Sequence, residues 1–140
     1  MSNEYIFELN EGQPASNGNF TYLNGMVRTA YDRMNVYSKK TLSVKHLDTV
    51  VAYVVLNESK NGKRLYIEPI QCINSYHPDI LNITDLLINE VTNYAKSKKI
   101  NDISLLIHND SEALYEFFRK RKFNKAIDYY NRHTLLTKCI

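Results

Sequence analysis

The chain has 140 residues, 44% hydrophobic and 24% charged, a balance typical of folded globular proteins rather than of disordered, collagen-like or coiled-coil ones. Its formal net charge of +3 permits an anionic ligand but does not suggest the dense basic face that nucleic-acid binding usually needs. The first residues lack the cationic start and apolar run of a signal peptide, and no stretch approaches the ~18 apolar residues of a membrane span. We therefore expect one cytoplasmic domain, residues 1–140, that folds without disulfides or metal.

The N-terminal third predicts a strand, a loop and a helix. Residues 5–9 are a short strand candidate, and residues 10–19 form a loop that contains two glycines and a proline. From Phe20 to Met34, apolar residues recur at helical spacing, which predicts a helix despite Gly25.

Three strands are expected next, as an antiparallel meander. Residues 41–46 and 50–56 are β-rich segments on either side of a short turn, so they predict a hairpin. The polar segment that follows has Asn61 and Gly62 at its tip, a common hairpin signal. It returns the chain to a third strand over residues 65–73.

Residues 65–108 organise the rest of the fold. After the strand and a turn at residues 74–79, apolar residues recur every three or four positions and predict a helix whose inner face packs on a sheet. These residues are Ile80, Ile83, Leu87, Val91, Tyr94 and Ala95. Residues 102–108 are nearly all apolar and predict a central strand. Strand, helix and strand therefore make a right-handed βαβ unit.

The C-terminal part predicts a helix over residues 111–122 and strands over residues 125–130 and 134–139. Ser111, or a capping box of Asn109 and Glu112, is expected to cap this helix. Its inward residues are expected to be Ala113, Leu114, Phe117 and Phe118. The full order predicts an α/β (α+β) fold with a mixed, mostly antiparallel central sheet, splayed between its fourth and fifth strands, and helices on both faces.

The two cysteines, Cys72 and Cys139, lie in strand-like sequence without a metal-ligand spacing. We expect both to be buried, reduced thiols, and we expect no metal site.

The order of elements and the segment 109–123 resemble the GNAT superfamily of acyl-CoA-dependent N-acyltransferases. In that family the corresponding helix opens with Asn and ends in a Tyr-x-x-x-Gly-Phe-like signature. Counting back from Phe123 places the tyrosine at Phe118 and the glycine at Lys122. The resemblance covers the chain from about residue 41 onward. It implies a GNAT-like fold and transfer of an acyl group from acetyl-CoA, or another acyl-CoA, to a primary amine of a small molecule or a protein.

The resemblance also suggests catalytic candidates. Glu68, on the strand before the first long helix, is the candidate base, although a solvated strand carboxylate is an equal alternative. Tyr115 is the candidate acid in place of the missing tyrosine, with simple packing as its alternative. His77 and His108 each follow one strand of the βαβ unit and are expected to bracket the cleft.

Coenzyme binding in the family uses a glycine-rich turn, whose backbone N–H groups at a helix start grip the pyrophosphate. Here Leu81 and Ile83 stand where glycines belong. The basic run of residues 119–122 is either a phosphate clamp or a solvated helix end. The residues expected to contact the coenzyme are Ile73, Asn82, Ile83, Asn109 and Arg119.

Two functional classes therefore stay open. The first is an acyl-CoA-dependent acetyltransferase whose acceptor is a small-molecule or protein amine, with no nucleic acid or membrane as partner. The second is a catalytically inactive GNAT-fold binding or regulatory module that no longer binds acyl-CoA. Leu81, Ile83 and Phe118 favour the second class, and the resemblance favours the first. The oligomeric state is open, with a homodimer as one option.

Overall fold

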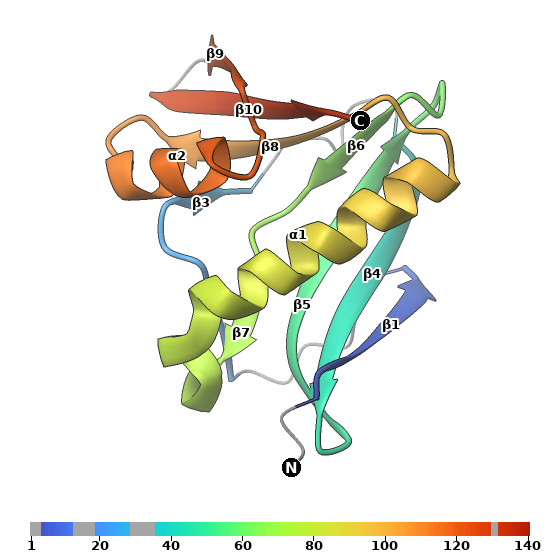
Figure 1. Cartoon of the computed structure of the whole chain (residues 1–140), viewed down its shortest axis with the longest axis vertical. Helices are drawn as coiled ribbons and strands as arrows, with labels where there is room; N and C mark the ends of the chain where they lie inside the picture. The colour runs from blue at the N-terminus through green and yellow to red at the C-terminus, as the bar shows by residue number, and fades with distance from the viewer. Residues whose placement is uncertain (1–3, 13–18, 29–35, 130–131) are drawn as a thin grey trace.

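The computed structural model describes residues 4–12, 19–28, 36–129 and 132–140 (Figure 1). In this part of the chain, ten strands form one sheet whose main path runs β1-β4-β5-β6-β8-β10-β9. The pairing of β6 with β8 is parallel, and the other described pairings are antiparallel. The predicted mixed α/β fold with a mostly antiparallel sheet is confirmed.

The first half of the sheet is built on a hairpin of β4 (Val36–His46) and β5 (Thr49–Ser59), with β1 (Ile6–Glu11) at the outer edge of β4. Its turn places Leu47 and Asp48 at φ values of 52° and 66°. Two left-handed residues in a two-residue loop match the twist of the flanking strands. The predicted hairpin is therefore confirmed.

The strand predicted over residues 65–73 is interrupted. It consists of β6 (Arg64–Ile67) and β7 (Gln71–Ile73), and Pro69, which has no N–H to give to a ladder, lies between them. β6 pairs with β8 (Asp102–His108) only over its first residues, from Arg64 to Tyr66. Beyond that point the two strands separate, as the splayed sheet predicts.

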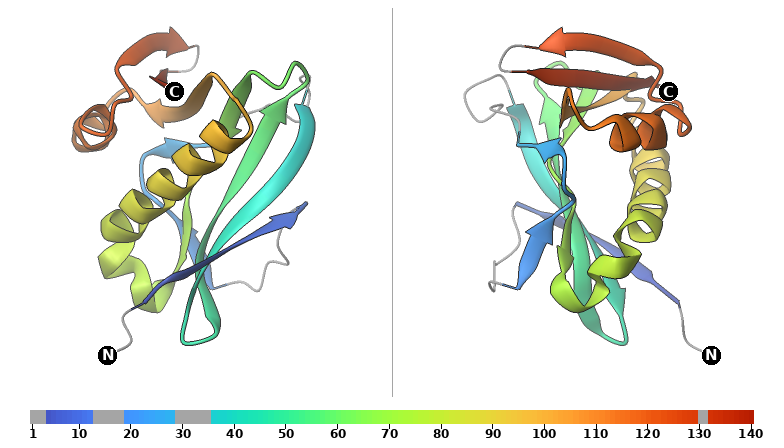
Figure 2. Two further views of the ribbon diagram at one scale, coloured as in Figure 1. Left: turned by 45° about the vertical axis from the view of Figure 1, so that its right-hand side comes forward. Right: turned by 90° about the vertical axis from the view of Figure 1, so that its left-hand side faces the viewer.

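The long helix α1 (Ile80–Ser97) follows a 3-10 turn, η2 (Asn74–Asp79), and crosses one side of the sheet (Figure 2). Most of the predicted inner face is confirmed. The fully or nearly fully buried members are Ile80, Ile83, Leu87, Val91 and Ala95, whereas Tyr94 is only half-buried.

The second helix, α2 (Glu112–Arg119), is shorter than predicted. Leu114 and Phe118 are buried, but Ala113 is exposed, which corrects its predicted inward position. Figure 2 shows α2 on the same side of the sheet as α1. In the described part of the chain, therefore, the expected helix cover on the opposite face is not found.

The end of the chain forms a hairpin of β9 (Lys125–Tyr129) and β10 (His133–Cys139), close to the predicted strands, and β10 also pairs with β8. Cys72 is buried as expected. Cys139 is exposed, which corrects the expectation of two buried thiols, because it lies at the end of β10 beyond the packed core.

The helix predicted from Phe20 to Met34 is wrong for residues 20–28. Its remaining residues, 29–34, lie outside the described part of the chain. Instead, β2 (Phe20–Tyr22) pairs with β7, and β3 (Met26–Val27) pairs with β8. Gly25 between them has φ = +102°, far from any helical value. The helical spacing of the apolar residues was therefore misleading.

We call residues 20–27 the bridging segment, because they join the two strands that splay apart. The Leu23 N–H donates to the Ile70 carbonyl oxygen at 2.8 Å, and the His108 N–H donates to the Gly25 carbonyl oxygen at 2.9 Å. Leu23 and Met26 are both 5% exposed. The gap between β7 and β8 is thus filled by the chain itself.

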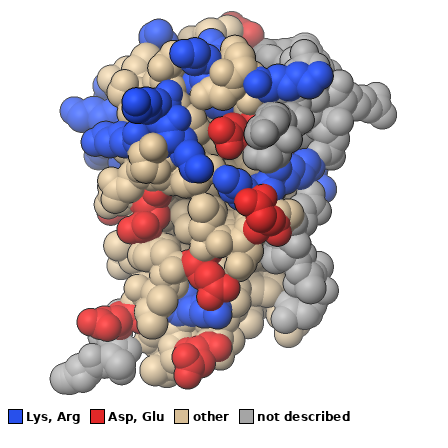
Figure 3. All heavy atoms as spheres, turned by 90° about the vertical axis from the view of Figure 1, so that its right-hand side faces the viewer, with Lys and Arg blue, Asp and Glu red and all other residues tan. Residues whose placement is uncertain are grey.

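Charge is unevenly spread over the surface. On the face drawn in Figure 3, Lys and Arg gather toward one end, whereas Asp and Glu lie mainly toward the other. Exposed lysines also end α1, at positions 96, 98 and 99, where cations stabilise the helix through its dipole.

Candidate active site

Two adjoining cavities open along α2. The larger, which we call the apolar groove, has a volume of about 620 Å³ and lies between α1, the bridging segment and α2. Its apolar lining comes from Leu23, Ile80, Leu81, Leu114 and Phe117, and it also contacts His77, Glu116, Lys120 and Arg121.

The smaller cavity, which we call the polar cavity, has a volume of about 550 Å³ and lies at the start of α2. Its polar lining comes from Asn24, His108, Asp110, Ser111 and Glu112. The two cavities share Asn24, Ala113 and Leu114, so they adjoin along one side of α2.

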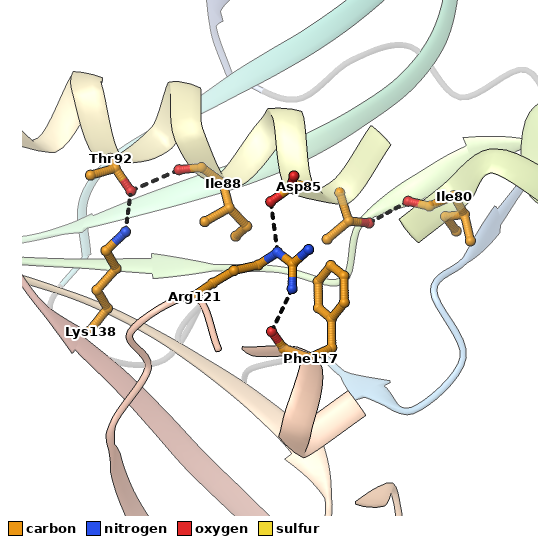
Figure 4. A network of polar contacts seen from close by, with 8 residues as sticks. Ile80, Asp85, Ile88, Thr92, Phe117, Arg121 and Lys138 are labelled. Atoms are coloured by element: carbon orange, nitrogen blue, oxygen red, sulfur yellow. Dashed lines mark hydrogen bonds and ion pairs between the residues drawn. The ribbon is translucent and has the colours of Figure 1, made fainter. Parts of the chain in front are cut away.

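Arg121 is held tightly at the rim of the apolar groove (Figure 4). Its Nε donates to Asp85 Oδ1 at 2.7 Å, and one of its terminal nitrogens donates to the Phe117 carbonyl oxygen at 2.9 Å. The guanidinium carbon also lies 3.6 Å from the centre of the Phe117 ring. This network joins the end of α2 to α1 and fixes one wall of the groove.

A second contact in Figure 4 joins β10 to α1. Lys138 donates to Thr92 Oγ1 at 3.0 Å, and Thr92 donates to the Ile88 carbonyl oxygen at 2.8 Å. Burial lowers the pKa of the Lys138 amine, and the nearby charges of Lys96 and Lys122 lower this pKa further. The contact of Lys138 with α1 is made through the hydroxyl of Thr92.

The start of α1 differs from a glycine-rich phosphate turn. The 3-10 turn runs directly into the helix, and the Ile80 N–H donates to the His77 carbonyl oxygen. Leu81 is 48% exposed and lines the groove, whereas Ile83 is fully buried in the core. Of the two residues at glycine positions, only Leu81 therefore stands in the way of a ligand. Asn82 is exposed and lines neither cavity.

The two predicted catalytic residues line neither cavity. Glu68 donates its backbone N–H to the Val55 carbonyl oxygen at 3.0 Å, and its carboxylate accepts a bond from Asn57 at 3.3 Å. Tyr115 is half-buried and packs against the core. Neither residue lines the apolar groove or the polar cavity, and the two are not brought together there.

The predicted coenzyme contacts are also dispersed. Ile73 is paired with Phe20 of the bridging segment. The Asn109 side chain accepts a bond from Thr134, so it does not form the predicted capping box, and Ser111 makes no side-chain cap bond either. Arg119 is exposed and ion-paired with Glu116 at 2.9 Å. None of the five predicted contact residues, which are these three together with Asn82 and Ile83, lines either cavity.

The two histidines do bracket the cleft, as expected. His77 lines the apolar groove, with Nε2 at 3.3 Å from the Tyr22 carbonyl oxygen. His108 lines the polar cavity and stands opposite His133 of β10, with 5.2 Å between the ring centres.

A second face of α2, continued by Lys120 just after the helix, lines the groove and was not predicted from the sequence, although Lys120 itself was noted in the basic run. Ala113, Glu116, Phe117 and Lys120 follow helical spacing and all line the groove. The helical spacing of these four residues can be seen in the sequence, but the sequence analysis placed Ala113 and Phe117 on the face of the helix that packs on the core.

The family signature fits the backbone at one of its positions. Lys122, at the glycine position, has φ = +78°, a conformation that glycine adopts without strain. Phe118, at the tyrosine position, is fully buried and has no hydroxyl to offer. A backbone conformation suited to glycine is therefore present at the family's glycine position, whereas the tyrosine hydroxyl that would act as the acid is absent at position 118.

No protein-family model matches the sequence, and no similar sequence was found among curated proteins. Solved structures, by contrast, include many similar folds. The IAA acetyltransferase from Bacillus cereus ATCC 14579 matches with a TM-score of 0.67 and 14% identity, over 98% of this chain and 100% of that one.

Two further similar structures hold a ligand. A GNAT family acetyltransferase from Elizabethkingia anophelis with acetyl-CoA bound matches with a TM-score of 0.57 and 15% identity, over 89% of this chain and 100% of that one. The PaiA N-acetyltransferase from Thermoplasma acidophilum, in complex with coenzyme A, matches with a TM-score of 0.59 and 18% identity, over 79% of this chain and 65% of that one. The chain therefore has the GNAT fold, as the order of its elements predicted.

The described residues also bear on metals and membranes. Among them, no three His, Cys, Asp or Glu side chains are placed to hold a metal ion. Neither described α-helix is long and apolar enough to cross a membrane.

Proposed function

We propose that the chain is a GNAT-type N-acyltransferase that moves an acyl group, acetyl in the simplest case, from acyl-CoA to a primary amine. The observation that carries the proposal is the apolar groove of about 620 Å³ on a GNAT fold, with cations at one end. Similar folds with coenzyme A or acetyl-CoA bound support the same donor.

The groove offers both kinds of contact that an acyl-CoA needs. Lys120 and Arg121 supply positive charge for its phosphates, and Leu23, Leu81 and Phe117 supply apolar contact for its uncharged arm. Asp85 already neutralises part of the charge of Arg121, so Lys120 should contribute more to the binding of an anion. The coenzyme supplies the activated thioester, and the chain binds and orients it.

A binding module without acyltransferase activity is the second candidate, and the bridging segment favours it. Both edges of β7 are paired, with β5 on one side and β2 on the other. Phe20–Tyr22 pairs with Gln71–Ile73 along the edge of β7 that faces the gap, so β2 occupies the edge where backbone N–H groups could otherwise meet a thioester carbonyl. Phe118 also leaves the family's acid position without a hydroxyl.

Thermal unfolding with and without acetyl-CoA tests the proposal. A single site held at a hundred times its dissociation constant stabilises the folded state by about 2.7 kcal/mol, which raises Tm measurably. Lys120→Ala should weaken the effect, and more at low salt than at high salt. Arg119→Ala is the matched control, since Arg119 is the neighbouring cation but does not line the groove.

A second variant tests the start of α1. Leu81→Gly removes the exposed side chain at the family's glycine position, so it should strengthen acetyl-CoA binding by opening the backbone to the ligand. If millimolar acetyl-CoA and longer acyl-CoAs leave Tm unchanged, the acyltransferase proposal fails and the binding module takes its place.

A further inference from the structure

We propose that the polar cavity is the acceptor pocket, that it takes a small amine carrying a second positive charge, and that His108 is the base that removes the proton from the attacking nitrogen. The inference rests on the proposed function, because it assumes that the acyl donor occupies the adjoining apolar groove. It adds the class of acceptor and a catalytic residue.

The two cavities meet where a transfer reaction needs them to meet. They share Asn24, Ala113 and Leu114, so ligands in the two cavities would lie end to end along α2. A donor in the groove can therefore present its thioester at the junction, and an amine in the polar cavity can approach it from the other side. Such an arrangement brings two reactants together without moving the bridging segment.

Charge changes sign along this path. The groove carries Lys120 and Arg121 at the end of α2, and the polar cavity carries Asp110 and Glu112 at its start. The ion pairs found in the described part of the chain do not include these two carboxylates. An anionic donor and a cationic acceptor are thus each drawn to a different end of the cleft.

His108 is the best-placed base in the polar cavity. It is the last residue of β8, its side chain is exposed, and its backbone N–H is fixed by the bond to the Gly25 carbonyl oxygen. Imidazole accepts protons near neutral pH, which suits general-base catalysis. The titratable side chains placed near it are those of His133 on β10 and the two carboxylates, Asp110 and Glu112.

The proton balance of the step is complete. His108 takes one proton from the acceptor ammonium, and the free amine attacks the thioester carbonyl carbon. The new C–N bond forms as the C–S bond breaks. Of the two protons that the nitrogen gives up in total, one goes to the departing thiolate and the other leaves through His108 to water.

The experiment follows release of the coenzyme thiol from acetyl-CoA, with two acceptors of equal length. 1,4-Diaminobutane carries a second positive charge, whereas 4-aminobutanoate carries a carboxylate in its place. We expect kcat/KM to be at least tenfold higher for the diamine. The double change Asp110→Asn and Glu112→Gln should abolish that preference, and Asp128→Asn, an exposed acidic residue outside the cavity, should leave it intact.

His108→Gln should lower kcat about a hundredfold or more, while the Tm shift caused by acetyl-CoA stays unchanged. His108→Asn, a smaller replacement, should behave in the same way, and an unchanged Tm without ligand excludes loss of the fold. Full activity in His108→Gln would overturn its assignment as the base.

The outcomes separate this inference from the proposed function. If acetyl-CoA does not shift Tm, the proposed function fails. If acetyl-CoA does bind but the diamine is turned over no better than 4-aminobutanoate, or neither is turned over, the acceptor pocket is overturned while donor binding stands.

Discussion

Gly25→Ala should destabilise the protein through two separate effects. Gly25 has φ = +102°, which strains any residue with a Cβ. A Cβ at this position would also lie 2.7 Å from Ser111 Oγ and 3.0 Å from Leu114 Cδ2. Strain at such a φ costs about 1–3 kcal/mol, and overpacking costs about the same again. We therefore expect a loss of about 2–6 kcal/mol in the free energy of unfolding.

Gly62→Ala is the matched control. Gly62 also has a positive φ, +68°, but nothing lies within 4 Å of the position that its Cβ would take. Only strain remains, and the reduced entropy of the unfolded chain offsets part of it. We expect a loss of about 1 kcal/mol or less.

The difference between the two variants measures how closely the bridging segment packs on α2. Urea unfolding, followed by a helix-sensitive and a tertiary signal, gives both free energies of unfolding on one scale. Equal losses in the two variants would show that Gly25 and Ser111 are not in close contact. The reasoning about the bridging segment would then be refuted.

Two further predictions concern the core. Leu87→Asp should unfold the protein or lower its free energy of unfolding by more than about 4 kcal/mol, since Leu87 is fully buried. The control, Asn89→Asp on the exposed side of the same helix, should change the free energy of unfolding, measured by thermal unfolding, by less than about 0.5 kcal/mol. Burial, with the nearby charge of Asp79, raises the pKa of the Cys72 thiol from its ordinary 9.0 to about 11. At pH 8 an alkylating reagent should therefore label Cys139 and leave Cys72 unmodified, which mass spectrometry would show. Labelling of both thiols in the folded protein would contradict the burial of Cys72.

The raised pKa of Cys72 also makes the free energy of unfolding depend on pH. Between pH 9 and about 11 the thiol ionises in the unfolded chain but stays protonated in the folded one. Its contribution to stability is therefore complete below pH 9 and is lost as the pH rises toward 11.

The βαβ unit was predictable because its signals are local and agree with one another. Ile83, Leu87 and Val91 repeat at the helical period, and the short apolar run that follows is typical of a buried central strand. Counting back from Phe123 placed the family's glycine at Lys122, but the left-handed backbone there (φ = +78°) was not predicted and is known only from the structure.

The bridging segment was not predictable in the same way. Its conformation depends on β7 and β8, which lie far along the chain, and these partners override the helical spacing of Phe20, Leu23 and Val27. Gly25, directly after Asn24, was the one local sign of a turn.

The cavities escaped prediction for a related reason. They are formed where three separate segments meet, and although Leu81 and Lys120 were each noted in the sequence, no local pattern brings them together in one groove. Only the phase of α2 relative to α1 decides whether a residue such as Ala113 faces the core or the groove.

The position of the bridging segment in the chain affects the order in which the sheet can be completed. Phe20 pairs with Ile73, and Met26 pairs with Ile107, so the segment closes very long loops of chain. During synthesis from the N-terminus, residues 20–27 leave the ribosome long before β8 exists. The residues that close the centre of the sheet are therefore synthesised early but can pair only after β8 has been made. Until β8 is in place, Leu23 and Met26 cannot be buried as they are in the folded protein.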